Sequence, residues 1–168
     1  MNNKTIMATL GAIALTVAAL PASAQTSTPT GLSLKLGVAY PTDSGVRKAT
    51  SNTWFMGGIE YRFKDMPVTT PDMKSHLSVS ADYYSHSNVN IIPVLINYVM
   101  DQQQTFWEIG AGAAWLHAPG TTQTKFAYQA GFGVNFAKGP TPAFAELRYI
   151  GTSENHSGAV VADVGVRF

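Results

Sequence analysis

The chain has 168 residues and no cysteine, and its 11 Lys and Arg nearly balance its 10 Asp and Glu. This length fits one small domain, and the lack of cysteine excludes disulfide bonds and cysteine-ligated zinc. A balanced charge gives no basic surface, so nucleic-acid binding is not expected. Charged residues make up only 12% of the chain, which is about half the share typical of soluble domains.

The first segment, residues 1–24, is predicted to be a secretory signal peptide rather than part of the fold. Lys4 precedes an apolar run of roughly 15 residues, which is too short to span a bilayer as a helix. The run ends in Ala22-Ser23-Ala24, a small-residue pattern typical of signal-peptide cleavage sites. Residues 25–30 (QTSTPT) are then expected to form a flexible lead-in.

The rest of the chain, residues 31–168, alternates apolar and polar side chains in eight runs bounded by turn-forming residues. No segment shows a helical period. The runs are 32–40, 53–63, 75–84, 91–100, 105–116, 123–136, 143–150 and 159–168. Short connections between eight strands favour an all-β fold, an eight-stranded antiparallel up-and-down barrel.

The placement of charge distinguishes a transmembrane β-barrel from a soluble one. A soluble barrel of the lipocalin type has apolar side chains inside and charges outside, whereas a membrane barrel has the reverse. Beyond residue 24, no charge lies on the apolar face of a predicted strand. Ten charges lie on the less apolar face: Lys35, Glu60, Arg62, Asp82, Glu108, Lys125, Glu146, Arg148, Asp163 and Arg167. The others lie in turns, so the pattern predicts a transmembrane barrel.

Aromatic residues on the apolar face give independent support, because they gather at the two ends of the strands. One group is Tyr61, Phe63, Tyr98, Trp107, Phe136 and Phe168, and the other is Tyr40, Phe55, Tyr83, Trp115, Phe126 and Tyr149. Aliphatic residues lie between the two groups. Aromatic belts on either side of an aliphatic band match the two interfaces and the hydrocarbon core of a bilayer.

The lumen of such a barrel is expected to be filled rather than open. Eight strands enclose a bore that side chains fill, so a wide pore is not expected. The ten charges of the less apolar face would point inward, and charges removed from water must pair. We therefore predict an ion network formed by these ten residues. A gated ion path along the same column of charges is the alternative.

The end of the chain carries a resemblance to a known family. Val164, Val166 and Phe168 alternate in the last strand, and this pattern resembles the assembly signal of bacterial outer-membrane proteins. The layout of residues 31–168 is similar to that of the small OmpA-like barrels, here without a periplasmic domain. The resemblance implies a bacterial outer-membrane location, contact with outer-membrane lipid, and recognition by the barrel-assembly machinery. We expect a structural or surface-interaction role and no cofactor.

An enzyme related to the lipid A deacylases is an alternative, because some barrels of this size carry a His–Ser pair near the outer rim. The sequence offers His86-Ser87 and His156-Ser157, the second with Glu154 close by. Adjacent residues of a strand point to opposite faces, so neither pair is placed for catalysis. We expect no enzymatic activity, and no metal-ligand spacing is present.

A barrel that binds lipid or another small molecule is the third possibility. Small inward residues on the fifth and sixth strands, with apolar residues on the fourth, suggest a pocket; they are Gly110, Gly112, Ala114, Gly131, Gly133, Ile91, Pro93 and Leu95. The favoured alternative is that the small residues make room for long side chains opposite. Pro93 also predicts a bulge or a local break in strand pairing.

Overall fold

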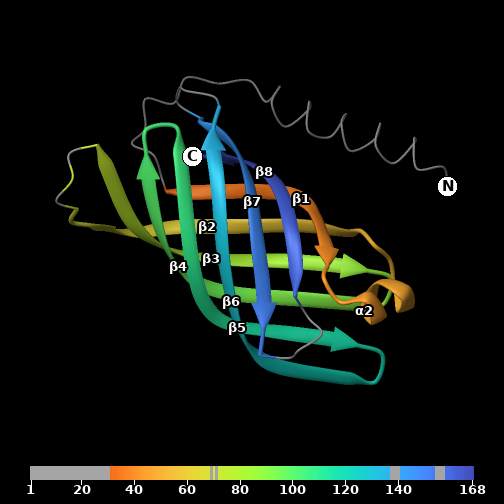
Figure 1. The fold of residues 1–168 in the computed structure, drawn as a ribbon. Coiled ribbons are helices and arrows are strands. Elements are labelled where there is room, and N and C mark those ends of the chain that lie inside the picture. Colours follow the sequence, from red (N-terminus) through yellow and green to blue (C-terminus); the bar gives the residue numbers. More distant parts are fainter. Residues whose placement is uncertain (1–30, 69, 71, 137–140, 154–157) are drawn as a thin grey trace.

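The computed structural model describes residues 31–68, 70, 72–136, 141–153 and 158–168, which form a closed barrel (Figure 1). Its strands are β1 (Leu32–Pro41), β2 (Trp54–Met66), β3 (Met73–His86), β4 (Val89–Gln102), β5 (Thr105–Ala118), β6 (Thr121–Asn135), β7 (Ala143–Thr152) and β8 (Ala159–Arg167). The predicted eight-stranded antiparallel up-and-down barrel is confirmed. The predicted signal peptide (1–24) and lead-in (25–30) lie outside the described residues.

Each strand pairs with the next along the chain, and β1 closes the barrel against β8. The closing ladder runs from Ser33 opposite Arg167 to Pro41 opposite Ala159. Closure removes the open sheet edge that would otherwise leave backbone groups unpaired. We call the end of the barrel that holds Gly31 and Phe168 the terminus end, and the opposite end, where β1 meets α2 (Ser44–Ala49), the α2 end.

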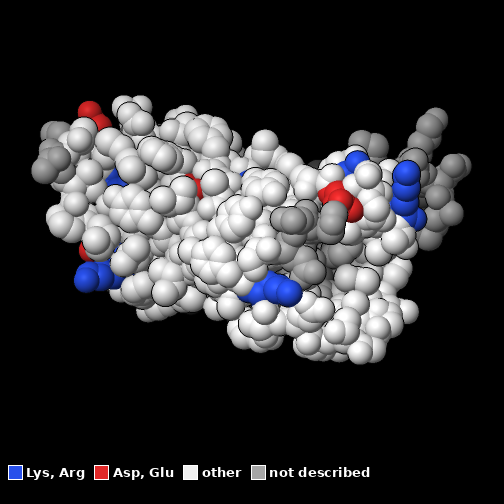
Figure 2. All heavy atoms as spheres, turned by 60° about the horizontal axis from the view of Figure 1, so that its bottom comes forward, with Lys and Arg blue, Asp and Glu red and all other residues white. Residues whose placement is uncertain are grey.

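Alternate side chains point outward and inward, as the period of two in the sequence requires. The outward set is apolar and exposed, and Ile96, Ile109 and Leu147 have exposed fractions of 59%, 55% and 58%. Aromatic residues such as Phe55 and Phe63 are also exposed on this surface. On the face shown in Figure 2, most charged side chains lie towards the two ends; one basic side chain lies near the middle, and the rest of the surface between the ends is mostly uncharged.

The helix α2 differs from the sequence prediction, which contained no helix. Asp43 caps its N-terminus by accepting a hydrogen bond from the Val46 amide at 2.9 Å. Arg47 Nη1 donates to the carbonyls of Pro41 and Thr42 at 2.7 and 2.6 Å, which anchors the helix to the end of β1. A helix of six residues is too short to show a helical period in the sequence. Among the described residues, no helix is long and apolar enough to cross a membrane.

Two irregularities in the ladders bear on the predictions. Beside Pro93, β3 and β4 keep one register, with Ala81 opposite Val94 and Tyr84 opposite Ile91, but the two positions between these pairs are unpaired. The predicted local break is therefore present without a bulge, because proline has no amide hydrogen to donate. The register shift lies instead on β2, between Arg62 and Lys64.

Candidate functional site

The centre of the lumen is filled by a cluster of polar side chains contributed by strands from all around the barrel. Its charged members are Lys35 (β1), Glu60 (β2), Asp82 (β3), Glu108 (β5), Glu146 and Arg148 (β7) and Asp163 (β8), and all of them are buried. Each lies on the inward parity of its strand, so the alternation in the sequence brings them together. We call this group the central cluster; it holds seven of the ten residues predicted to form the ion network.

Arg148 is the main cation of the central cluster, with an exposed fraction of 1%. Its Nη1 lies 2.7 Å from Asp82 Oδ2, and its Nε lies 3.0 Å from Asp163 Oδ2. Its Nη1 also donates to Gln129 Oε1 at 3.0 Å. The guanidinium thus links β3, β6 and β8 across the lumen from its own strand, β7. Charge-assisted hydrogen bonds of this kind are stronger than neutral ones.

Lys35 is the second buried cation, and it lies nearer the terminus end. Its Nζ is 2.6 Å from Glu60 Oε2 and 3.2 Å from Glu146 Oε2. Glu146 Oε2 is also 3.7 Å from Arg148 Nε, so this carboxylate joins the two cations. The pair Glu146 and Arg148, two residues apart on β7, share one face of the strand as the spacing predicts.

Neutral side chains complete the cluster, and the sequence reasoning did not single them out. Gln129 Nε2 donates to Glu108 Oε1 at 2.5 Å and to Asn97 Oδ1 at 2.9 Å. Asn97 Nδ2 in turn donates to Ser80 Oγ at 3.0 Å. Asn97 and Ser80 lie on the inward parity of β4 and β3, as Gln129 does on β6. Their position on the same faces as the predicted charges was the signal that could have found them.

Acids outnumber cations in the central cluster, with five carboxyl groups against Lys35 and Arg148. Hydroxyl groups supply further donors: Ser78 Oγ donates to Glu60 Oε1 at 2.5 Å, and the Tyr84 hydroxyl donates to Asp82 Oδ2 at 3.1 Å. Among the described residues, one oxygen each of Asp82, Glu146 and Asp163 still accepts no hydrogen bond. Hydrogen-bond donors are therefore scarce in this cluster, and each cation contacts several carboxylates.

Arg62 lies apart from the central cluster, at the terminus end, where its Nε donates to Asp65 Oδ1 at 2.7 Å. The Arg62 side chain is 39% exposed there. A register shift follows it on β2, between Arg62 and Lys64. The alternation of residue types does not reveal where such a shift occurs.

Arg167 also lies apart from the central cluster, in an aromatic layer at the terminus end. Its guanidinium is 4.7 Å from the centre of the Phe106 ring and 4.6 Å from that of Phe144. Its Nη1 donates to Asn135 Oδ1 at 2.6 Å. The two rings meet edge to face, with their centroids 5.6 Å apart. Cation–π contacts therefore replace the ion pair predicted for Arg167.

Lys125 lies towards the α2 end, opposite Ala114 in the β5–β6 ladder. It is four residues from Gln129 along β6, a rise of about 13 Å in a β-strand. That distance places its backbone well away from the central cluster. Of the ten predicted network residues, Arg62, Lys125 and Arg167 are thus positioned at the ends of the lumen, while the other seven meet at its centre.

A cavity of about 470 Å³ opens at the terminus end, below the central cluster. Charged and aromatic side chains line it together, including Arg62, Asp65, Lys74, His76, Asp101 and Arg167. His76 Nδ1 lies 3.2 Å from Asp101 Oδ2 in this wall. Lys35, Glu60 and Glu108 of the central cluster form the inner limit of this cavity.

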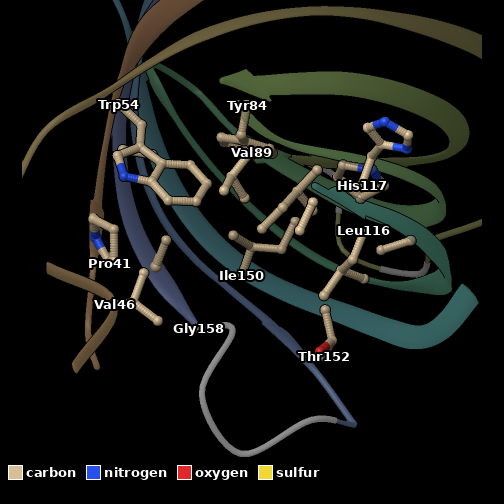
Figure 3. Close-up of a pocket in the computed structure, with 16 residues that line it drawn as sticks. Pro41, Val46, Trp54, Tyr84, Val89, Leu116, His117, Ile150, Thr152 and Gly158 are labelled. Carbon is tan, nitrogen blue, oxygen red and sulfur yellow. The ribbon is translucent and has the colours of Figure 1, made fainter. Parts of the chain in front are cut away.

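A second cavity, of about 230 Å³, lies at the α2 end, above the central cluster, and we call it the α2-end pocket (Figure 3). Its wall is formed by Ala39, Pro41, Val46, Trp54, Tyr84, Val89, Ile91, Pro93, Ala114, Leu116, His117, Ala118, Ile150, Thr152, Gly158 and Ala159. In Figure 3, the Trp54 ring reaches in from one side, and Ile150 and Leu116 lie across the space. The wall is almost wholly apolar, in contrast to the cavity at the terminus end.

The α2-end pocket only partly matches the pocket suggested by the small residues. Ile91, Pro93 and Ala114 line it, but Leu95 packs in the buried core beside it. Gly110 and Gly131 leave room for other side chains: a side chain at Gly110 would collide with Asn97, and one at Gly131 would crowd Glu146 and Arg148.

Gly112 and Gly133 have the same kind of role. A side chain at Gly133 would collide with the Phe106 ring, and one at Gly112 would meet the Val94 carbonyl. These glycines therefore make room for neighbours, which was the favoured alternative, although those neighbours are not only arginines.

The three residues of the predicted assembly signal lie at the end of the closing strand. Val164 and Val166 line a groove on the outer surface together with Leu34 and Leu36. The Phe168 amide donates to the Leu32 carbonyl at 2.8 Å, which continues the pairing of β8 with β1.

The candidate catalytic pairs give no assembled catalytic group among the described residues. His86 ends β3, and its ring stacks on Trp54 with centroids 6.4 Å apart. Ser87 follows in the tight turn to β4 with a positive φ of 53°. No described hydrogen bond joins a histidine to a serine. The pair His156-Ser157 and Glu154 lie outside the described residues.

No protein-family model and no curated protein sequence matches the chain. Among solved structures, it is similar to Neisserial surface protein A, with a TM-score of 0.54 and 16% identity over 84% of this chain and 98% of that one. It is also similar to the outer membrane enzyme PagL, with a TM-score of 0.53 and 14% identity over 82% of this chain and 97% of that one. The chain has the fold of the small eight-stranded outer-membrane barrels. At these identities, the likeness of the barrel to either protein concerns the fold alone.

Proposed function

We propose that this protein is a bacterial outer-membrane barrel with a structural or surface-interaction role, without a wide pore and without catalysis. The observation that carries the proposal is the reversed arrangement of its side chains. Charged groups such as Lys35 and Arg148 are buried in the lumen, while large apolar side chains cover the outside. Lipid solvates such an exterior, whereas water would leave it as an extended apolar patch.

Backbone pairing supports a position in lipid. A strand can cross hydrocarbon only when all its backbone groups are paired, and β1 closes against β8 so that the ring of strands has no free edge. The exposed aromatics Tyr61 and Phe136 near the terminus end and Phe55 and Trp115 near the α2 end are suited to the two interfaces of a bilayer. Export by the signal peptide and assembly through Val164, Val166 and Phe168 are parts of the same proposal.

The contents of the lumen support a barrel without a wide pore. The central cluster spans the bore from β1 to β7 through Lys35–Glu146 and from β3 to β7 through Asp82–Arg148. Below it, Phe106, Phe144 and Arg167 pack against one another. An ion path would require these buried groups to exchange partners, and each buried cation already contacts at least two acids.

A surface role is supported by the hydrogen bonds that hold the β1–β2 connection in place at the α2 end. The segment that joins β1 to β2 is held by the Asp43 cap and by the two hydrogen bonds from Arg47 to the end of β1. Thr42 Oγ1 donates to the Gly158 carbonyl at 3.0 Å, which ties this segment to the start of β8. A connection held in this way offers fixed side chains to a partner at the α2 end.

The test uses one substitution on the outer surface and one matched control beyond the apolar band. Ile96 lies near the middle of β4 and faces outward, so Ile96→Lys would place a charge in the hydrocarbon core at a cost of about 2–4 kcal/mol. Thr122→Lys lies in the exposed β6 end near the α2 end, where the cost should be about 0–1 kcal/mol.

The readouts are fractionation of cells into outer membrane and periplasm, and the faster migration of unboiled protein on a denaturing gel. We expect the unchanged chain and Thr122→Lys to be found in the outer membrane as heat-modifiable barrels, and Ile96→Lys to lose most of that form. A soluble, periplasmic protein in which Ile96→Lys is harmless would overturn the proposal.

Conductance of the purified barrel in planar bilayers tests whether the lumen is closed. Stable, large single-channel steps would exclude a closed bore.

A further inference from the structure

The α2-end pocket is a hollow that the proposed function does not use. Its volume of about 230 Å³ exceeds that of an apolar cavity of about 150 Å³ known to bind benzene. The central cluster closes its floor through Tyr84, whose hydroxyl donates to Asp82. Cavities of this size are uncommon in well-packed proteins, because each forfeits the contacts that side chains would otherwise make.

Three polar atoms in the wall of the pocket have partners. Trp54 Nε1 donates to Thr50 Oγ1 at 3.3 Å, and His117 Nδ1 lies within hydrogen-bond distance of Thr122 Oγ1 at 2.7 Å. The Tyr84 hydroxyl is directed to Asp82, and most of the remaining wall is aliphatic, with Ile150 and Leu116 among its residues. A polar ligand would lose its water partners here without replacement, whereas an apolar ligand would gain by leaving water.

The size of the cavity limits the ligand. If about 150 Å³ holds the six carbons of benzene, then the α2-end pocket of about 230 Å³ holds roughly nine non-hydrogen atoms. This is the size of a benzene ring with a three-carbon substituent. A complete lipid is far larger.

The route of entry distinguishes a free molecule from the acyl chain of a membrane lipid. At the level of the pocket, β1 stays paired with β8 at Pro41 and Ala159, and β4 with β5 at Asn90 and His117. The pairing of β6 with β7 ends at Ala127 and Thr152, and β6 continues beyond it towards the α2 end. Val46, Ala118 and Gly158 also line the pocket, so it reaches the α2 end of the barrel. A ligand would enter from the water outside the membrane.

From these observations we infer that the α2-end pocket binds a small, neutral, hydrocarbon-like molecule of about nine non-hydrogen atoms, taken up from the aqueous side. The inference goes beyond the structural role, because it assigns the barrel a ligand site at its α2 end. Binding replaces an empty cavity with van der Waals contacts to Trp54, Ile150 and Leu116 and removes the apolar surface of the ligand from water.

Trp54 provides the reporter, because it is the tryptophan that lines the pocket. The other two tryptophans of the chain, Trp107 and Trp115, are exposed on the outer surface. In the variant Trp107→Phe/Trp115→Phe, fluorescence comes from Trp54 alone. The chain is refolded into vesicles of phosphatidylethanolamine and phosphatidylglycerol and titrated with propylbenzene, or with benzamide as a polar molecule of the same number of heavy atoms. We expect a saturable change with propylbenzene and binding of benzamide that is weaker by about tenfold or more.

A matched pair of variants localises the binding to the pocket. Ala114→Leu adds three carbons inside it, and Ala113→Leu makes the same change on the neighbouring outward-facing residue of β5. Ala114→Leu should weaken propylbenzene binding by about tenfold or more, while Ala113→Leu should leave it unchanged. Ala159→Leu fills the pocket from β8 and gives the same test if Ala114→Leu does not refold.

Heat modifiability, the faster migration of unboiled protein on a denaturing gel, is measured for every sample. Folding and membrane insertion are therefore judged separately from binding. An inserted barrel without a saturable change in Trp54 fluorescence would overturn the inference while leaving the proposed function intact. The same holds if neither pocket-filling variant weakens that change.

A last experiment uses vesicles whose acyl chains carry bromine, which quenches tryptophan fluorescence on contact. Quenching of Trp54 that Ala114→Leu relieves would show a lipid chain in the pocket and would likewise overturn entry of a free molecule from water.

Discussion

The central cluster and the α2-end pocket occupy neighbouring lengths of the same lumen but differ in how they are filled. In the first, charged side chains from β1, β3, β7 and β8 meet and pair with one another. In the second, shorter side chains such as Ala39, Ala114 and Ala159 leave an apolar space. The side chains of the central cluster reach one another across the bore, whereas several of those around the α2-end pocket are too short to do so.

The difference has an energetic consequence. Residues of the central cluster depend on one another, because a buried charge that loses its partner keeps its desolvation cost. Residues around the pocket are more independent, since van der Waals contacts are lost or gained a few at a time. We expect substitutions in the cluster to cost much more stability than substitutions in the pocket.

The largest effect is expected from Arg148→Met. Removing the guanidinium leaves Asp82 and Asp163 without their cation in a buried site, and the free energy of unfolding should fall by about 3–5 kcal/mol. The measurement is guanidinium-induced unfolding of the barrel in vesicles, followed by tryptophan fluorescence. Arg62→Met is the control, because its partner Asp65 is mostly exposed, and it should cost less than about 1 kcal/mol. Equal losses for the two variants would contradict the proposed role of the central cluster.

A smaller effect is expected from Glu146→Ala. Lys35 loses one acid but keeps Glu60 at 2.6 Å, and Arg148 keeps both of its aspartates. The unfolding free energy should therefore fall by about 1.5–3 kcal/mol, the range for a hydrogen bond to a charged group. The same unfolding curves provide the measurement. Unchanged resistance to unfolding would show that Glu146 is dispensable to the cluster.

The smallest effect, and one of opposite sign, is expected from Ala114→Leu. The added carbons enter the α2-end pocket, so the variant should be more stable by about 0.5–2 kcal/mol, as is common when a cavity is filled. The unfolding midpoint should rise while its slope stays constant. A loss of stability would mean that the space beside Ala114 does not admit a larger side chain.

Much of the barrel was predictable because strand alternation is a local property. The inward parity of Asp82, Glu108 and Asp163 follows from counting in twos along each run, and all three are buried in the lumen. The fourth run was harder to interpret, since its inward face carries Pro93, Leu95 and Val99. These residues line or border the α2-end pocket and the aromatic layer, where the lumen itself is apolar.

Other features escaped prediction because they depend on geometry beyond a single strand. The register shift on β2 after Arg62 and the stacking of Arg167 on Phe106 and Phe144 leave no trace in the alternation of residue types. The helix α2 is a single capped segment, too short for a period. Gln129 and Asn97 were passed over because neutral polar residues are ordinary on an inward face, although Gln129 donates to both Glu108 and Asn97.

The sequence by itself determined the number of strands, their order and the face on which each side chain lies, because a period of two assigns sides without reference to any neighbour. Only the tertiary structure decided which inward residues meet. The tilt and stagger of strands around a closed barrel bring Arg148 against Asp82, 66 residues away along the chain, and leave a hollow above them. Those contacts depend on the lengths of side chains on opposite walls, which alternation does not encode.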